Sequence, residues 1–212
     1  MSDIMVVKRD GTKEALDIDK LHKVVFFACE DIKGVSASEV EIKSHIQFYD
    51  GIESANIQET LIKSAADLIT EETPNYQWVA GRLINYHLRK EVYDSYTPLP
   101  LREIVEKNVA RGYYDSELLT SYSADEWETL NNYIDHDRDN TIAYVGMEQM
   151  RGKYLAQNRV TGEIFETPQV AYMLIAATLF GEYPAETRIK YVTDYYDAIS
   201  KFEISLPTPV MA

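Results

Sequence analysis

The sequence is poor in cysteine: Cys29 carries the only thiol among 212 residues. A single thiol excludes an internal disulfide and a cysteine-rich zinc site, and this cysteine usage favours a reducing, cytoplasmic compartment. Because Val25, Phe26 and Phe27 closely precede it, we interpret Cys29 as a small core residue rather than a reactive thiol.

Long apolar runs and basic charge are also scarce. No stretch approaches the roughly 18 apolar residues that a membrane span requires, and the amino terminus lacks the apolar core of a signal peptide. The formal net charge is −14, which argues against a nucleic-acid-binding protein, because such proteins displace counterions from phosphates with a basic face. We therefore expect neither a membrane nor a nucleic acid as a partner.

Motifs for metals and for phosphate loops are missing as well. The segment 135–139 alternates aspartates, but it lacks the glycine and the terminal glutamate of a calcium loop, so we interpret it as a solvated turn. The Walker A and Rossmann glycine patterns are absent. No spacing that closes a metal site occurs among the four histidines, which are His22, His45, His87 and His136. We expect no metal ligands from the protein.

The first 93 residues predict a small sheet packed on four helices. Residues 5–18 are typical of a β-hairpin, because strand formers flank the turn signal Asp10-Gly11. Helical periodicity then appears in four segments, and the short connections between them favour antiparallel neighbours. These segments begin at about residues 19, 36, 54 and 75, and the last runs to Tyr93.

Local signals predict how these helices begin and which face is buried. Ser36 with Glu39 forms a capping box for the second helix, and Ser54 is the expected N-cap of the third. The apolar face of the second helix is expected to comprise Ile42, Ile46 and Tyr49.

The second half is also mainly helical. Pro98 and Pro100 forbid a continuous helix, so we place a domain boundary between Tyr93 and Leu101. Ser123 and Glu126 form another capping box. Further helices are expected at 104–112, 123–134, 141–155, 168–180 and 185–202, with a tight hairpin at 159–165. The fold class is therefore mainly α with a small β-sheet, in two domains, 1–93 and 94–212.

Three cations of this acidic chain gather around one hairpin, which suggests a ligand rich in phosphate. Lys8 and Arg9 precede the turn and Lys20 follows it in the first helical turn, where free backbone N–H groups favour anions. Arginine offers a planar fork for phosphate, and lysine a point charge. Lys90 could reach the same place if the fourth helix packs beside the first. The alternative is a solvated turn, because exposed ion pairs contribute only about 0–1 kcal/mol.

Acidic and aromatic residues could recognise a base next to these cations. Glu14 and Asp17 lie between the basic positions. A carboxylate accepts a hydrogen bond from the amino group of adenine, whereas guanine presents a carbonyl at that position. Phe48 and Tyr86 are candidates for an aromatic wall.

Several segments of the chain resemble one known family. In the first half these are VKRDG at 7–11, DKL at 19–21, SHIQFYDGI at 44–52, IKSAADLI at 62–69, PNYQWVAGRL at 74–83 and HLRK at 87–90. In the second half they are YIDHDRD at 133–139, KYL at 153–155, TGEI at 161–164 and ISLPTP at 204–209. Together they resemble the amino-terminal part of class Ia ribonucleotide reductase large subunits, which begins with a regulatory domain called the ATP-cone. The resemblance covers essentially the whole chain.

The resemblance implies a fold, ligands and a partner. The fold is a four-helix ATP-cone capped by a short sheet, followed by the helical start of a ten-stranded α/β-barrel catalytic domain. The cone would bind ATP as activator or dATP as inhibitor, with Mg²⁺, and the radical-generating small (beta) subunit would be the protein partner. The enzyme would reduce ribonucleotides to deoxyribonucleotides.

The resemblance also assigns residues, position by position. The phosphates would be held by Lys8, Arg9, Lys20 and Lys90, and the adenine read by Glu14 and Asp17, while Ser54 and Gln58 would lie near the sugar and the phosphates. The pocket would be lined by Leu16, Leu21, Phe48, Ile57 and Tyr86, and Thr208 would touch the substrate. Asp17 and Gln58 depart from the family, which usually has Asn and His there. Glutamine hydrogen-bonds but does not become a cation, so inhibition by dATP is less assured than binding.

The catalytic cysteines of the family have no counterpart in this sequence. Cys29 lies in the cone and cannot replace them, so the chain alone is expected to be inactive, without a redox cofactor, and to need the remainder of the large subunit from a second polypeptide. The alternative is a stand-alone module or remnant that senses adenine nucleotides and binds reductase subunits. A cone-bearing transcriptional repressor fits less well, because it needs a zinc ribbon with four cysteines.

Overall fold

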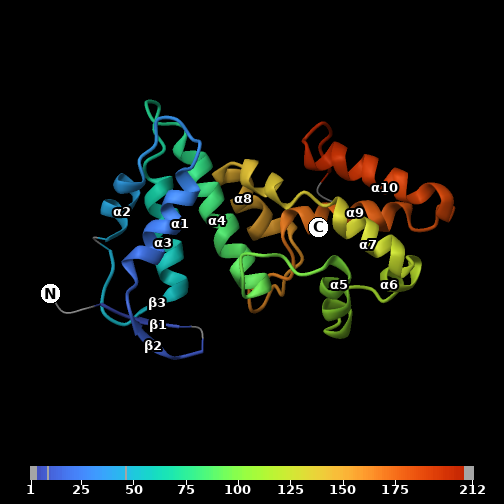
Figure 1. Cartoon of the computed structure of the whole chain (residues 1–212), viewed down its shortest axis with the longest axis horizontal. Coiled ribbons are helices and arrows are strands. Elements are labelled where there is room, and N and C mark those ends of the chain that lie inside the picture. The colour runs from blue at the N-terminus through green and yellow to red at the C-terminus, as the bar shows by residue number, and fades with distance from the viewer. Residues whose placement is uncertain (1–3, 9, 46, 208–212) are drawn as a thin grey trace. The chain divides into compact units, whose positions relative to one another are not determined.

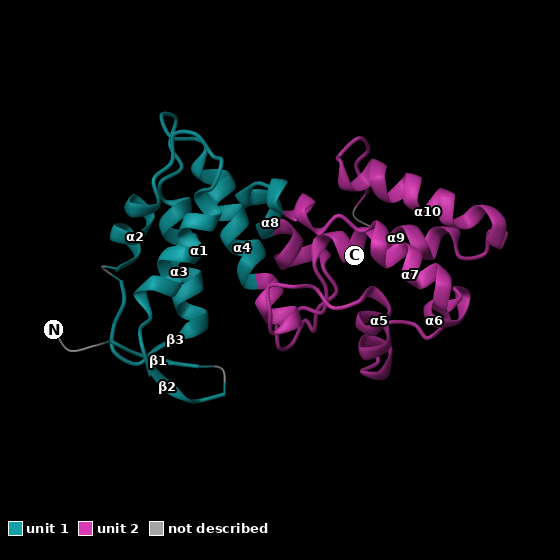
Figure 2. Cartoon of the chain, in the orientation of Figure 1, with its two compact units in different colours: residues 1–87, 140–148 teal, residues 88–139, 149–212 magenta. Residues whose placement is uncertain are grey.

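The structure is a computed structural model that describes residues 4–8, 10–45 and 47–207 (Figure 1). The chain divides into two compact units, the first formed by residues 1–87 and 140–148 and the second by residues 88–139 and 149–212 (Figure 2). Among the described helices, none combines the length and the apolarity of a membrane span.

A three-stranded sheet lies in the first unit. Its strands are β1 (Met5–Val7), β2 (Lys13–Ala15) and β3 (Ile52–Glu53), in the order β2-β1-β3. β1 pairs antiparallel with β2 and parallel with β3. The hairpin turn closes because Gly11 adopts a φ of +81°, a conformation that glycine tolerates at little cost. The predicted hairpin is confirmed, whereas β3 was not predicted, since two residues are too few to show strand alternation.

The second strand ends earlier than the sequence predicted. Ile18 belongs to the first helix, not to the strand, because the Asp17 side chain accepts a hydrogen bond from the Lys20 backbone N–H at 2.9 Å and so caps the helix.

Helices form most of the first unit. They are α1 (Ile18–Cys29), α2 (Ala37–His45), α3 (Ser54–Ala66), most of α4 (Tyr76–Tyr93) and α8 (Tyr144–Gln149). The core between them contains fully buried aliphatic side chains, among them Val25, Val40, Leu61, Val79 and Leu83. Residues 88–93 of α4 belong to the second unit.

The predicted buried face of α2 is wrong. Ile42 is 65% exposed and Tyr49 is 58% exposed, while Val40 and Ser44 are fully buried. The helix ends at His45, so Tyr49 lies beyond it and the periodicity on which the prediction relied is interrupted. Ile46 lies outside the described residues.

Two of the predicted caps differ in detail. Ser36 accepts a hydrogen bond from the Glu39 backbone N–H at 3.4 Å, but the Glu39 carboxylate accepts from the Tyr76 hydroxyl instead of returning to Ser36. Only half of that capping box forms. Ser54 is the first residue of α3 rather than its cap, because Glu53 occupies the cap position and makes no side-chain capping bond.

The second unit is mainly helical. Its elements are α5 (Leu101–Ala110), α6 (Glu117–Ser121), α7 (Ala124–Tyr133), most of the 3₁₀ helix η1 (His136–Thr141), the π-helix η2 (Met150–Tyr154), α9 (Pro168–Phe180) and α10 (Ala185–Ser200). The capping box of Ser123 and Glu126 is confirmed at the start of α7. The predicted hairpin at 159–165 is reduced to a single bridge between Gln157 and Ile164.

The predicted helix at 141–155 is broken. η1 ends at Thr141, α8 covers 144–149, and the chain then widens into the π-helix η2. Gln157 and Arg159 donate hydrogen bonds to carbonyls of that π-helix, Arg159 to Lys153 at 2.8 Å. These long side chains satisfy backbone groups that a regular helix would satisfy itself. A mainly helical fold with a small sheet is confirmed.

Candidate nucleotide-binding site

The sheet brings two distant segments to one edge. Lys8 follows β1 and Ser54 follows β3, and the parallel register pairs Val7 with Glu53. Lys8 and Ser54 therefore leave the sheet as neighbours. Because α3 starts at Ser54, the first-turn N–H groups of that helix open next to Lys8, an arrangement that favours an anion.

The start of α1 contributes a second cation. Lys20 lies in the first turn of α1, after the cap at Asp17. Burial raises the pKa of the Tyr86 phenol, and the charge of Lys20 acts in the opposite direction. Lys20 of α1 therefore acts electrostatically on the half-buried Tyr86 of α4.

Lys8 forms an exposed ion pair that another anion could replace. Its ammonium group lies 2.6 Å from the carboxylate of Glu14 on β2, and the two side chains are 29% and 52% exposed. An exposed pair of this kind contributes only about 0–1 kcal/mol. A phosphate group can therefore replace Glu14 as the partner of Lys8 at little cost.

A buried acceptor lies on the next turn of α3. The Oε1 atom of Gln58 is buried and makes no hydrogen bond to any of the described residues. A buried oxygen without a donor costs free energy, so Gln58 is prepared to accept a bond from a ligand. Beside it in sequence, Ile57 is buried, as is Leu21 of α1. Leu16 and Phe48 are half-buried, and their place in a nucleotide pocket stays a prediction.

Three predicted residues cannot be placed in this site. Arg9 and Thr208 lie outside the described residues. Lys90 lies on α4 within the second unit, so its role stays a prediction.

Two aspartates shape the hairpin through their side chains. Asp10, in the predicted turn, accepts hydrogen bonds from the backbone N–H and the hydroxyl of Thr12, at 2.9 and 2.7 Å, and these bonds lower its pKa. Asp50 accepts from the Met5 backbone N–H at 2.9 Å and ties β1 to the residues before β3. The role of Asp50 was not predicted, although it too precedes a glycine.

The described residues do not form a metal centre of their own. Among them, no group of three or more His, Cys, Asp and Glu side chains could hold an ion.

Two family models match the chain, the ATP cone domain over residues 4–91 and the ribonucleotide reductase all-alpha domain over residues 141–212. The chain belongs with the amino-terminal domains of ribonucleotide reductase alpha subunits. The resemblance on which the site residues were predicted is thereby confirmed.

Relatives of this reductase segment match it over nearly its whole length. The alpha subunits of Haemophilus influenzae and Escherichia coli are 52% and 51% identical to it over 209 residues, and the alpha subunit of phage T4 is 41% identical over 211 residues. Each match covers 99% of this chain and 28% of the relative. The chain thus spans little more than a quarter of these relatives.

Proposed function

We propose that this chain binds ATP or dATP as an allosteric effector and thereby regulates the reduction of ribonucleotides to deoxyribonucleotides by a ribonucleoside-diphosphate reductase. The observation that carries the proposal is the parallel pairing of β1 with β3, which sets Lys8 at the amino-terminal end of α3 within a segment matched by the ATP cone domain. Cations and free backbone N–H groups at one edge suit a triphosphate.

Each part of the nucleotide has a proposed partner. Lys8, Arg9, Lys20 and Lys90 hold the phosphates, together with a Mg²⁺ ion that the phosphates ligate. Glu14 and Asp17 accept from the adenine amino group. The wall is formed by Leu16, Leu21, Phe48, Ile57 and Tyr86, and the sugar lies toward Ser54 and Gln58.

The wider setting follows from the relatives and is also a proposal. The remainder of an alpha subunit supplies the catalytic cysteines, and a beta subunit supplies the radical. The complex acts in the cytoplasm, where its substrates are made. Thr208 contacts the ribonucleotide substrate.

Calorimetric titration with Mg-ATP tests the site. The double variant Lys8→Ala with Arg9→Ala should bind at least about a hundredfold more weakly than the wild type, because each charge-assisted hydrogen bond contributes about 1.5–3 kcal/mol. The matched control is Lys13→Ala with Lys33→Ala, which removes the same charge from two exposed lysines outside the site and should bind within about threefold of the wild type.

The possible results separate the proposals. If the double variant binds Mg-ATP as tightly as the control, the site is assigned to the wrong residues. If the wild type binds neither Mg-ATP nor Mg-dATP, the effector function itself is refuted.

A further inference from the structure

A buried ion pair that is not fully closed joins the last turns of α4 to η1. Arg89 and Asp139 are 3% and 0% exposed, and their nearest polar atoms, Nη2 and Oδ2, are 4.0 Å apart. The same Nη2 donates to the backbone carbonyl of His136. Within the described part of the chain, neither carboxylate oxygen of Asp139 nor the Nε of Arg89 has a hydrogen bond of standard geometry. Buried charges in this arrangement cost free energy that a tighter arrangement would recover.

Asp139 of η1 faces the start of α9. The side chain and the backbone N–H of Gln169, the second residue of that helix, are near enough to lower the pKa of Asp139. Thr167 occupies the N-cap position of α9 without a side-chain capping bond. A buried anion at this position compensates for the missing cap through the helix dipole.

A second contact connects the same two helices. The hydroxyl groups of Tyr93 and Thr167 are hydrogen-bonded at 2.9 Å and buried. The last turns of α4 therefore meet the start of α9 twice, once through Asp139 and once through Thr167.

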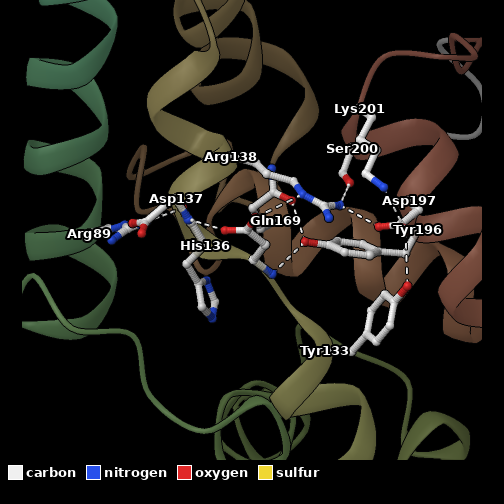
Figure 3. A network of polar contacts seen from close by, with 11 residues as sticks. Arg89, Tyr133, His136, Asp137, Arg138, Gln169, Tyr196, Asp197, Ser200 and Lys201 are labelled. Carbon is white, nitrogen blue, oxygen red and sulfur yellow. Dashed lines mark hydrogen bonds and ion pairs between the residues drawn. The ribbon is translucent and has the colours of Figure 1, made fainter. Parts of the chain in front are cut away.

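The other side of η1 is held firmly. Arg138 donates from Nη1 to Asp197 at 2.7 Å and to the Ser200 hydroxyl at 2.6 Å, both on α10, and the Tyr196 hydroxyl accepts from the Asp135 backbone N–H at 3.0 Å (Figure 3). Since η1 is fixed to α10 by these short bonds, the contact with room to change is the one between Asp139 and Arg89.

We propose that Arg89 and Asp139 form a two-position ion pair, which closes or opens when nucleotide binding shifts α4, and which thereby transmits effector occupancy to the start of α9. The inference rests on the proposed function, because Lys90 adjoins Arg89 in sequence and Tyr86 precedes it by one turn of the same helix. One position is the observed separation of 4.0 Å. The other is a bidentate pair with N–O distances of about 2.7–2.9 Å, which a rotamer change of the long arginine side chain can reach. A ligand shifts such an equilibrium only through unequal affinity for its two states.

Titration of the acid gives an independent way to open the pair. Burial raises the pKa of Asp139 to about 7, and the charge of Arg89 opposes the rise. The groups that face Asp139 are Arg89 and Tyr93 of α4, Asp137 of η1, Gln169 and Tyr172 of α9, and Tyr196 of α10. The tyrosines have pKa values raised by burial, so Asp139 is the member of this set that changes charge near neutral pH.

Hydrogen exchange on the whole chain, with and without saturating Mg-ATP, tests the coupling. In the wild type at pH 8, Mg-ATP should change the exchange rates of amides in η1 and in the first turn of α9 by about threefold or more. Arg89→Lys keeps the charge but loses the fork, and it should abolish most of this change while binding Mg-ATP within about twofold of the wild type. The matched control is Arg188→Lys, which disrupts another pair in the second unit, with Glu126, and should keep the change.

A wild-type measurement covers the case in which Arg89→Lys does not fold. After correction for intrinsic exchange, the effect of Mg-ATP on η1 and α9 should shrink at least twofold between pH 8 and pH 6, as Asp139 takes up a proton. Calorimetry at both pH values confirms saturation. If Mg-ATP binds but leaves η1 and α9 unchanged, or if the change persists in Arg89→Lys or at pH 6, the ion pair does not couple them and the effector site stands. Failure of the wild type to bind Mg-ATP would refute the proposed function instead.

Discussion

Gly81 tests how closely α4 packs in the first unit. A Cβ atom at this position would lie 2.3 Å from the carbonyl oxygen of Ile142 and 3.2 Å from the carbonyl carbon of Ala143. Both obstacles are backbone atoms, so no side-chain rotation can relieve the overlap. Gly81→Ala therefore forces α4 and the segment 142–144 apart.

The size of the effect follows from opposing contributions. Alanine in a helix is favoured over glycine by up to about 1 kcal/mol, whereas overpacking of a tight contact costs about 1–3 kcal/mol. Moving α4 away from the segment 142–144 also strains the hydrogen bonds that Arg82 and Asn85 of α4 donate to Asn140, at 3.4 and 2.8 Å. Losing each of these bonds would cost about 0.5–1.5 kcal/mol. We expect a net loss of about 2–3 kcal/mol in the free energy of unfolding.

Urea unfolding followed by circular dichroism measures this loss, and a matched glycine controls for the helix propensity. A Cβ atom on Gly152 would meet nothing within 4 Å, so Gly152→Ala should stay within about 0.5 kcal/mol of the wild type. The melting temperature of Gly81→Ala should fall by about 2–4 °C for each kcal/mol lost. Equal stability of the two variants would refute the close contact between α4 and the 142–144 segment.

Two further predictions concern titratable groups. The Arg188 guanidinium donates to both carboxylate oxygens of Glu126 at 2.6 Å and lowers the pKa of that carboxyl from 4.5 to about 2. Because the folded pKa lies below the unfolded one, this stabilisation is present above pH 4.5 and is lost as the pH falls toward 2. The free energy of unfolding of Glu126→Gln should be about 1–3 kcal/mol lower than that of the wild type at pH 7. Urea unfolding at several pH values should also show that the variant has lost this pH dependence. Partial burial raises the pKa of the Cys29 thiol to about 11, so iodoacetamide should label the native chain at pH 8 at least about tenfold more slowly than the urea-unfolded chain, as followed by mass spectrometry. Equal rates would contradict the raised pKa.

Local signals in the sequence were enough for elements that depend only on neighbouring residues. The hairpin turn at Asp10-Gly11, the capping box of Ser123 and Glu126 and the helix at 168–180 all form where the sequence predicted them. Each rests on interactions between residues a few positions apart, so the residues that form the element also lie within the stretch of sequence that predicts it.

Elements that depend on distant partners were missed. β3 exists because β1 lies beside it. The face of α2 was misjudged because burial of Val40 rather than Ile42 depends on how α2 packs on its neighbours. No window of sequence around any of these residues contains that information.

The candidate site shows the same division. Its cations were recognisable as an unusual group in an acidic chain, but their neighbours were not: the closeness of Lys8 to the start of α3 requires the parallel register of β1 and β3, and the buried oxygen of Gln58 requires the packing of α3. The chemistry of the residues suggested the cations and the base-recognition candidates, and resemblance to the family added the other candidate residues.

If the proposed function holds, the candidate site would combine loosely held charges with a fixed apolar side. Lys8 is paired with Glu14 through a weak exposed contact, so little would be lost if a phosphate took its place. Leu21 and Ile57 are already buried, so little ordering would be needed around a bound base. The proposed effector would then act on the rest of the chain only through unequal affinity for two positions of α4.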